Sequence, residues 1–201
     1  MRLLIYSDSL MKHLPHEFLE FLQYKGQFST VETKVHPGYT VNDLISNAGP
    51  IHQDLTSETI LFLSSCQNDI SKLVKHSGQT DSQIAATVIS NLTSATCQLL
   101  QNHPTLTVFH VPLHYRHLNQ QIDTRFPESK TQSYIDRVNG IIETISNDPL
   151  QCACHPDRVF AKHTDTFRTQ AGLLSQDGLH YNADGKVQAL IETFTAFQMT
   201  Q

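Results

Sequence analysis

The sequence has few charged residues and lacks a long hydrophobic run. Charged residues make up 16% of the 201 residues, and hydrophobic residues make up 39%. This balance excludes a disordered chain and a coiled coil, and no apolar run approaches the length of a membrane span. A chain of this length buries about 70% of its surface on folding. We therefore expect a single domain that covers residues 1–201.

Basic residues are also few, with 14 Lys and Arg against 19 Asp and Glu and a formal net charge of −5. A nucleic-acid interface needs a basic face, so we expect no direct nucleic-acid binding. The opening MRLLIY is too short an apolar run for a signal peptide, because Asp8 follows soon after it. Four cysteines in a chain of this length do not predict a disulfide scaffold. We expect an intracellular, cytoplasmic protein.

Several ligand-binding motifs are missing. The sequence has no G-x-G-x-x-G and no P-loop pattern, which argues against dinucleotide or nucleotide triphosphate binding, and it lacks the G-x-S-x-G elbow. Cys152, Cys154, His155 and His163 are possible zinc ligands. Their C-x-C-H spacing lacks the usual gap and no second pair follows, so we expect a loop with no metal and no cofactor.

Short apolar runs alternate with segments of helical periodicity. The runs predict strands at 3–6, 30–36, 59–64, 106–111 and 159–161. The periodic segments predict helices at 13–25, 40–55 with an interruption at Gly49-Pro50, 81–101, 132–146 and from 183 onward. This alternation predicts an α/β fold, with a mostly parallel five-stranded sheet covered on both faces. Ligands in such folds bind at the carboxyl ends of the strands.

Four polar motifs fall at that predicted edge: SDSL at 7–10, HPG at 36–38, CQND at 66–69 and DGLH at 177–180. Acyl transfer needs a nucleophile, a base, a group that orients the base, and donors for the oxyanion. Ser9 at a strand-to-helix turn suits the nucleophile, His180 the base, and Asp177 the orienting carboxylate. Backbone N–H groups of Ser9 and Gly38, with the amide of Asn68, suit the oxyanion hole.

These motifs resemble those of the SGNH (GDSL-type) hydrolase family, whose name records the residues that match Ser9, Gly38, Asn68 and His180. The resemblance implies a flavodoxin-like three-layer α/β/α sandwich and a serine esterase without metal or organic cofactor. It implies a Ser9–His180–Asp177 triad acting on short-chain, acetyl or lipid esters. PGYTVNDLI and DGLHYNADGK are also similar to the esterase domain encoded by the first open reading frame of some non-LTR retrotransposons.

The motifs depart from the family pattern at two positions, because Ser7 and Cys66 stand where the family usually has Gly. If either position needs a positive φ, the substitution destabilises the fold by about 1 kcal/mol or more. This leaves an alternative function, a catalytically weak lipid- or membrane-binding module of a larger protein. A further cluster after the fourth strand reads as a substrate rim for acidic groups or as a solvated loop: His110, His114, Arg116 and His117.

Overall fold

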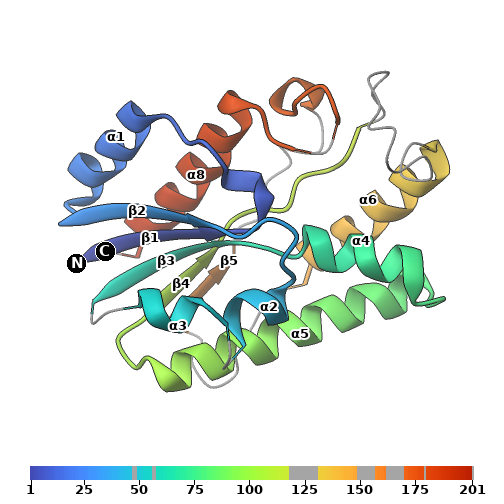
Figure 1. Cartoon of the computed structure of the whole chain (residues 1–201), viewed down its shortest axis with the longest axis horizontal. Coiled ribbons are helices and arrows are strands. Elements are labelled where there is room, and N and C mark those ends of the chain that lie inside the picture. The colour runs from blue at the N-terminus through green and yellow to red at the C-terminus, as the bar shows by residue number, and fades with distance from the viewer. Residues whose placement is uncertain are drawn as a thin grey trace.

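The computed structural model describes residues 1–46, 49–55, 58–117, 131–148, 157–161, 170–178 and 180–200. Its centre is a sheet of five strands in the order β2-β1-β3-β4-β5, with neighbouring strands parallel (Figure 1). The strands are β1 (Arg2–Ser7), β2 (Thr30–Val35), β3 (Thr59–Ser64), β4 (Thr107–His110) and β5 (Val159–Ala161). The predicted α/β class and parallel sheet are confirmed.

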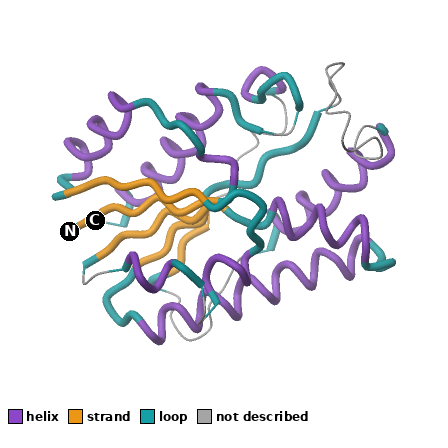
Figure 2. The backbone as a smooth tube through the Cα atoms, viewed as in Figure 1, coloured by secondary structure: helices purple, strands orange, loops and turns teal. Residues whose placement is uncertain are grey.

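Helices cover both faces of the sheet (Figures 1 and 2). One face carries α1 (His16–Gly26) and α8 (Ala183–Gln198). The other face carries α2 (Val41–Ile45), α3 (Ile51–Asp54), α4 (Gln67–His76), α5 (Asp81–Asn102) and α6 (Gln132–Ser146). Strand β1 shows how one strand serves both layers. Leu3 and Ile5 are buried against α1 and α8, and Leu4 and Tyr6 are buried against the opposite helices.

Local sequence signals set several helix boundaries. Thr80 forms a capping box with Gln83 at the start of α5. Asn182 caps α8 by accepting the Gly185 N–H. The expected interruption within 40–55 is confirmed, because α2 ends at Ile45 and α3 begins at Ile51.

Helix α4 (Gln67–His76) is absent from the helices that the sequence predicts. This helix carries few apolar residues, and its first turn follows Cys66 without a side-chain cap. Ile70 is buried in the core, with Leu73 and Val74 packed beside it. Burial against the core, rather than a local sequence signal, therefore stabilises α4.

The strand order reverses between β1 and β3, which makes the carboxyl ends of these two strands the expected place for a site.

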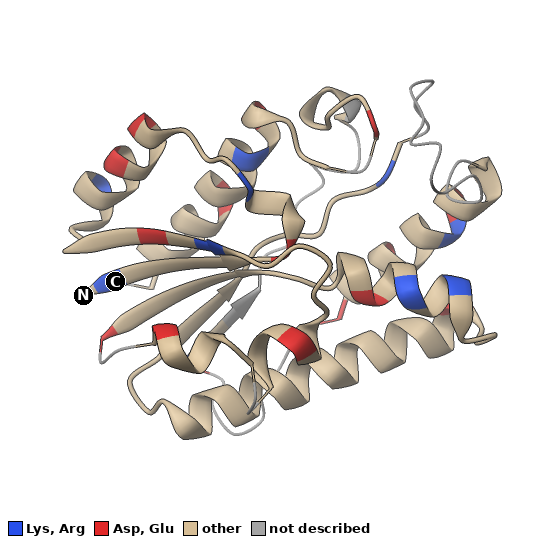
Figure 3. Cartoon of the chain, viewed as in Figure 1, with Lys and Arg blue, Asp and Glu red and all other residues tan. Residues whose placement is uncertain are grey.

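In Figure 3, acidic and basic residues are interspersed over the helices in view. Within the described residues, no helix combines the length and the apolar character that crossing a membrane requires.

Candidate active site

Ser9 lies where β1 ends, as the first residue of a single 3-10 turn, η1 (Ser9–Met11). Two side chains hold this turn in place. Asp8 Oδ1 accepts the Leu10 N–H at 3.0 Å, and Ser7 Oγ accepts the Met11 N–H at 3.3 Å. Because η1 is only one turn long, the helix dipole at the Ser9 N–H is small.

His180 and Asp177 share one turn ahead of α8. His180 Nδ1 lies 2.6 Å from Asp177 Oδ2, and the His180 backbone N–H donates to Asp177 Oδ1 at 2.9 Å. A proton on Nδ1 makes the first contact a hydrogen bond and leaves the Nε2 lone pair free to accept. Asp177 therefore holds the imidazole in the orientation and tautomer that a general base needs.

The two segments meet across 171 positions of sequence, where Ser9 Oγ lies 3.1 Å from His180 Nε2. Asp177, His180 and Ser9 thus form one continuous path of hydrogen bonds. The structure brings these three predicted residues together. This geometry suits transfer of the hydroxyl proton to the imidazole.

Several neighbouring residues support the Asp177–His180 turn, and among them Ser175 and Tyr181 were not predicted to belong to the site. Ser175 Oγ lies 2.9 Å from Asp177 Oδ1 and 2.9 Å from the His180 carbonyl oxygen. The His117 N–H donates to the Gly178 carbonyl at 3.1 Å, and the buried Tyr181 hydroxyl donates to the Pro112 carbonyl at 3.1 Å. A serine two residues before an aspartate in a turn is a local signal that points to such a contact.

Gly38 lies in the loop that follows β2. Its φ is +81°, and among the described residues other than Gly38 and its two chain neighbours, no heavy atom lies within 4 Å of the place where a Cβ would stand. The backbone conformation therefore favours glycine, and the space above it is open to a substrate oxygen. A side chain here would add strain and fill that space.

Asn68, the second residue of α4, links the other loops of this edge. Its Nδ2 donates to the Tyr39 carbonyl oxygen at 3.0 Å and to Asp8 Oδ2 at 3.4 Å. The predicted oxyanion donor therefore lies between the loop of Gly38 and the residue before Ser9. Both Nδ2 hydrogens have acceptors in this state.

Asp8 is the most deeply buried acidic residue at this edge, with 1% of its surface exposed. Burial raises its pKa from 3.8 to about 7, against the opposing effects of the Leu10 N–H and of His180. The nearby Asp69 carboxylate, which accepts the Val41 N–H at 3.0 Å, raises the pKa of Asp8 further. Asp8 also caps η1, since its side chain accepts the Leu10 N–H.

The two departures from the family pattern differ in their structural effect. Ser7 ends β1 in extended backbone, whereas Cys66 has a φ of +80° in the left-handed region that favours glycine. Burial also raises the pKa of the Cys66 thiol, so the group stays protonated. Cys66 is thus a small buried residue in a strained conformation, rather than a reactive thiol.

The segment after β4 was expected to be a substrate rim or a solvated loop, but two of its residues, His114 and Arg116, are buried. His114 is fully buried and Arg116 is 6% exposed. The Arg116 guanidinium donates to the Ser71 hydroxyl at 2.6 Å and to the Gln67 side chain at 3.3 Å, and its backbone N–H donates to Asn139 at 2.7 Å. Arg116 therefore fastens the first turn of α4, which carries Asn68, to the β4 loop.

The described cysteines differ in their bonding. Cys97 on α5 is disulfide-bonded, whereas the buried Cys66 is a free thiol. The zinc candidates Cys152, Cys154, His155 and His163 lie outside the described residues. Within the described residues, no three His, Cys, Asp or Glu side chains are grouped so that they could hold a metal ion.

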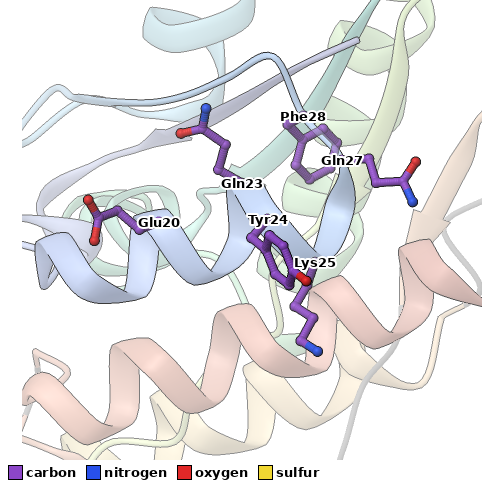
Figure 4. A pocket seen from close by; sticks show the side chains of 6 residues that line it. All are labelled: Glu20, Gln23, Tyr24, Lys25, Gln27 and Phe28. Carbon is purple, nitrogen blue, oxygen red and sulfur yellow. The ribbon is translucent and has the colours of Figure 1, made fainter.

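A separate hollow lies at the C-terminal end of α1, and Figure 4 shows its lining: Glu20, Gln23, Tyr24, Lys25, Gln27 and Phe28. The next residue, Ser29, donates its N–H to the Met1 carbonyl at 2.8 Å. This hollow therefore lies at the amino ends of the strands, opposite the edge that carries Ser9. It has no part in the hydrogen-bond path described above.

Comparison with solved structures identifies the fold. An acetyl xylan esterase, AlAXEase, superposes with a TM-score of 0.62 at 15% identity, over 98% of this chain and 99% of that one. A phospholipase A1 from Streptomyces albidoflavus NA297 gives 0.60 at 13% identity, over 97% and 98%. An extracellular lipase from Streptomyces rimosus gives 0.59 at 11% identity, over 98% and 99%.

The likeness shows that the chain shares its α/β fold with these esterases and lipases. No protein-family model and no curated protein sequence matches the chain. The narrower resemblance to retrotransposon esterase domains therefore stays a prediction. The roles of the site residues also stay predictions, which the next section takes up.

Proposed function

We propose that the chain is a serine esterase that hydrolyses carboxylic esters through an acyl-enzyme intermediate. The observation that carries this proposal is the path of hydrogen bonds from Asp177 through His180 to Ser9, at 2.6 and 3.1 Å. The fold shared with esterases and lipases supports it. The chemistry uses side chains and backbone of this chain alone.

In the first half of the reaction, His180 Nε2 takes the Ser9 hydroxyl proton while Ser9 Oγ attacks the ester carbonyl carbon. The tetrahedral intermediate collapses, the bond to the alcohol oxygen breaks, and His180 returns the proton to the leaving alcohol. In the second half, His180 deprotonates a water molecule that attacks the acyl carbon. The carboxylic acid leaves, and Ser9 regains its proton.

The negative charge on the carbonyl oxygen needs donors. The N–H groups of Ser9 and Gly38 and the side-chain amide of Asn68 are assigned this role. The open space above Gly38 supports the assignment. Removal of one such donor typically lowers turnover by about 10²–10³-fold.

Small acyl groups are the preferred substrates in this proposal. Among the described residues, the cavity lined by Cys66, Leu63 and Leu113 has a volume of about 10 Å³, which is too small for an acyl chain. The structural neighbours include an acetyl xylan esterase and a lipase, so the fold itself does not decide the acyl length. Acetate or another short ester is expected to react fastest.

The test is hydrolysis of p-nitrophenyl esters, from acetate to decanoate, by the parent protein and by Ser9→Ala. We expect Ser9→Ala to lose at least about 10³-fold in kcat/KM while its circular dichroism stays unchanged. Ser29→Ala, an exposed serine at the opposite edge of the sheet, is the matched control and keeps the parent rate. Esterase activity retained in Ser9→Ala would contradict the proposal.

A second candidate, a weakly active lipid-binding module, is favoured by one observation, the strained Cys66 backbone beside the site. It predicts a parent protein without measurable turnover that still co-sediments with phospholipid vesicles. Co-sedimentation that persists in Ser9→Ala, together with an inactive parent, would replace the esterase proposal.

A further inference from the structure

The contact between Asp8 and Asn68 gives a further inference, which rests on the proposed esterase function. We propose that Asp8 is a positioning residue that competes with the reaction's oxyanion for an N–H of Asn68, and that the protein is active when the Asp8 carboxyl is neutral. Asp8 touches no reacting atom in this scheme. It acts through the amide of Asn68.

The first step of the argument concerns the two N–H donors of the Asn68 side chain. Its Nδ2 has two hydrogens, and in this structure one acceptor is the Tyr39 carbonyl at 3.0 Å and the other is Asp8 Oδ2 at 3.4 Å. An oxyanion can take an N–H only if one of these bonds opens. The bond to Asp8 is the longer one, so it is the one expected to open.

The second step concerns the charge of the Asp8 carboxyl group. An ionised carboxylate is a stronger acceptor than a neutral carboxyl group, so it holds the Asn68 N–H more firmly. It also places a negative charge next to the amide that would stabilise a second negative charge. Loss of the Asp8 charge removes both effects. Burial raises the pKa of Asp8 to about 7, which makes the neutral form accessible near neutral pH.

Several titratable groups act on Asp8 from the surrounding elements. His180, ahead of α8, favours the charged form when it is itself charged, and Asp69 on α4 disfavours it. Arg116, Cys66 and Tyr181 also interact electrostatically with Asp8. The charge of Asp8 therefore depends on several neighbouring groups, which is why the test compares the parent with a variant at Asp8 itself.

The variant Asp8→Asn separates these effects. Asparagine keeps an oxygen for the Leu10 N–H and presents an NH₂ group, which accepts no hydrogen bond, toward Asn68. Its kcat/KM for p-nitrophenyl acetate is measured from pH 5 to 10 beside that of the parent and of Asp136→Asn, a remote and exposed control. We expect the parent to fall above about pH 7 and Asp8→Asn to stay level, exceeding the parent about tenfold at pH 9.

A second measurement does not depend on turnover. In ¹⁵N-labelled parent protein, the Asn68 side-chain resonances, assigned by their loss in Asn68→Ala, are expected to shift with pH with a midpoint near the pKa of Asp8, about 7. They are expected not to shift at that midpoint in Asp8→Asn. If the chemical shifts of the Asn68 side chain did not change with pH in the parent, the inference would be overturned even if Asp8→Asn failed to fold.

Each kinetic outcome has one meaning. The inference is overturned if kcat/KM of Asp8→Asn still falls above about pH 7, or if kcat/KM of the parent does not fall there. Either result leaves the esterase proposal standing. Loss of activity in folded Asp8→Asn at every pH overturns it as well, because the charged carboxylate would then be required. A parent that hydrolyses no ester overturns the proposed function itself.

Discussion

Ser9 belongs to a buried segment, whereas its partner His180 belongs to an exposed turn. The residues that precede Ser9 are almost wholly covered, with Ser7 0% and Asp8 1% exposed. The side chains of His180 and Asp177 are 39% and 37% exposed. The buried segment takes its position from the sheet, whereas the exposed turn is held by hydrogen bonds within itself and to the segment after β4.

The same contrast separates the two aspartates. Asp177 is exposed, and it holds the imidazole that faces Ser9. Asp8, which directly precedes Ser9, is buried, and burial raises its pKa to about 7. Two carboxyl groups near one serine are thereby given different protonation behaviour by their surroundings. Changes in the turn should alter activity alone, and changes in the buried segment should alter stability and pH dependence.

The largest effect is expected in the turn. His180→Ala and Asp177→Asn should each lower kcat/KM by roughly 10³–10⁴-fold, because the base is lost or its orientation is lost. Their free energies of unfolding should stay within about 1 kcal/mol of the parent, since both side chains are partly exposed. Ester hydrolysis and urea denaturation measure the two quantities. A large loss of stability in both variants would contradict the contrast.

The next effect concerns Asp8 and the pH dependence of stability. The folded protein holds the Asp8 proton up to its pKa of about 7, whereas an unperturbed carboxyl releases it near 3.8. Ionisation therefore penalises the folded state alone, and this contribution to the free energy of unfolding falls as pH rises through that window. Asp8→Asn should gain stability over the parent as pH rises, by up to about 4 kcal/mol at pH 8.

Thermal or urea unfolding of parent and Asp8→Asn at pH 4 and pH 8 measures this difference. Asp136→Asn, at an exposed helix position, should show no such change with pH. A gap between parent and Asp8→Asn that is the same at both pH values would show that Asp8 ionises as an ordinary carboxyl.

A substitution of the buried Arg116 tests whether its hydrogen bonds to α4 position Asn68. Arg116→Met keeps much of the apolar stem but removes the hydrogen bonds to Ser71, Gln67 and Tyr134. We expect a loss of about 2–3 kcal/mol in the free energy of unfolding, because buried acceptors lose their donor. The residual folded enzyme should have a lower kcat, as α4 carries Asn68. Unchanged stability would remove Arg116 from this role.

Periodicity predicted the sheet and most helices, because alternating apolar runs and capped periodic segments are local signals. Strand β1 and helix α5 were predicted to within a residue or two at each end. Helix α4 was not predicted, since its stability comes from packing against the core rather than from its own pattern. The class of fold followed from the order of these elements.

The site was only partly visible in the sequence. The proximity of Ser9, Asp177 and His180 could be predicted because their motifs fell at one predicted edge of the sheet. The contact of Asp8 with Asn68 joins residues 60 positions apart through side-chain orientation, and no local pattern encodes it. The burial of Arg116 was hidden for the same reason, since a polar loop in sequence reads as solvated.

The smallest effect belongs to Cys66, the position where the sequence raised a conditional prediction. Its φ of +80° is now known, so a residue with a Cβ is strained there. Cys66→Gly relieves the strain but removes a buried side chain, and these two changes nearly cancel. Cys66→Ala keeps the strain and loses only the sulfur. The comparison of Cys66→Gly with Cys66→Ala therefore isolates the backbone, and we expect the glycine variant to be more stable by about 1 kcal/mol in urea denaturation. Equal stability of the two variants would show that the turn before α4 relaxes to accommodate a side chain. The backbone beside the site would then be less rigid than the burial of Cys66 indicates.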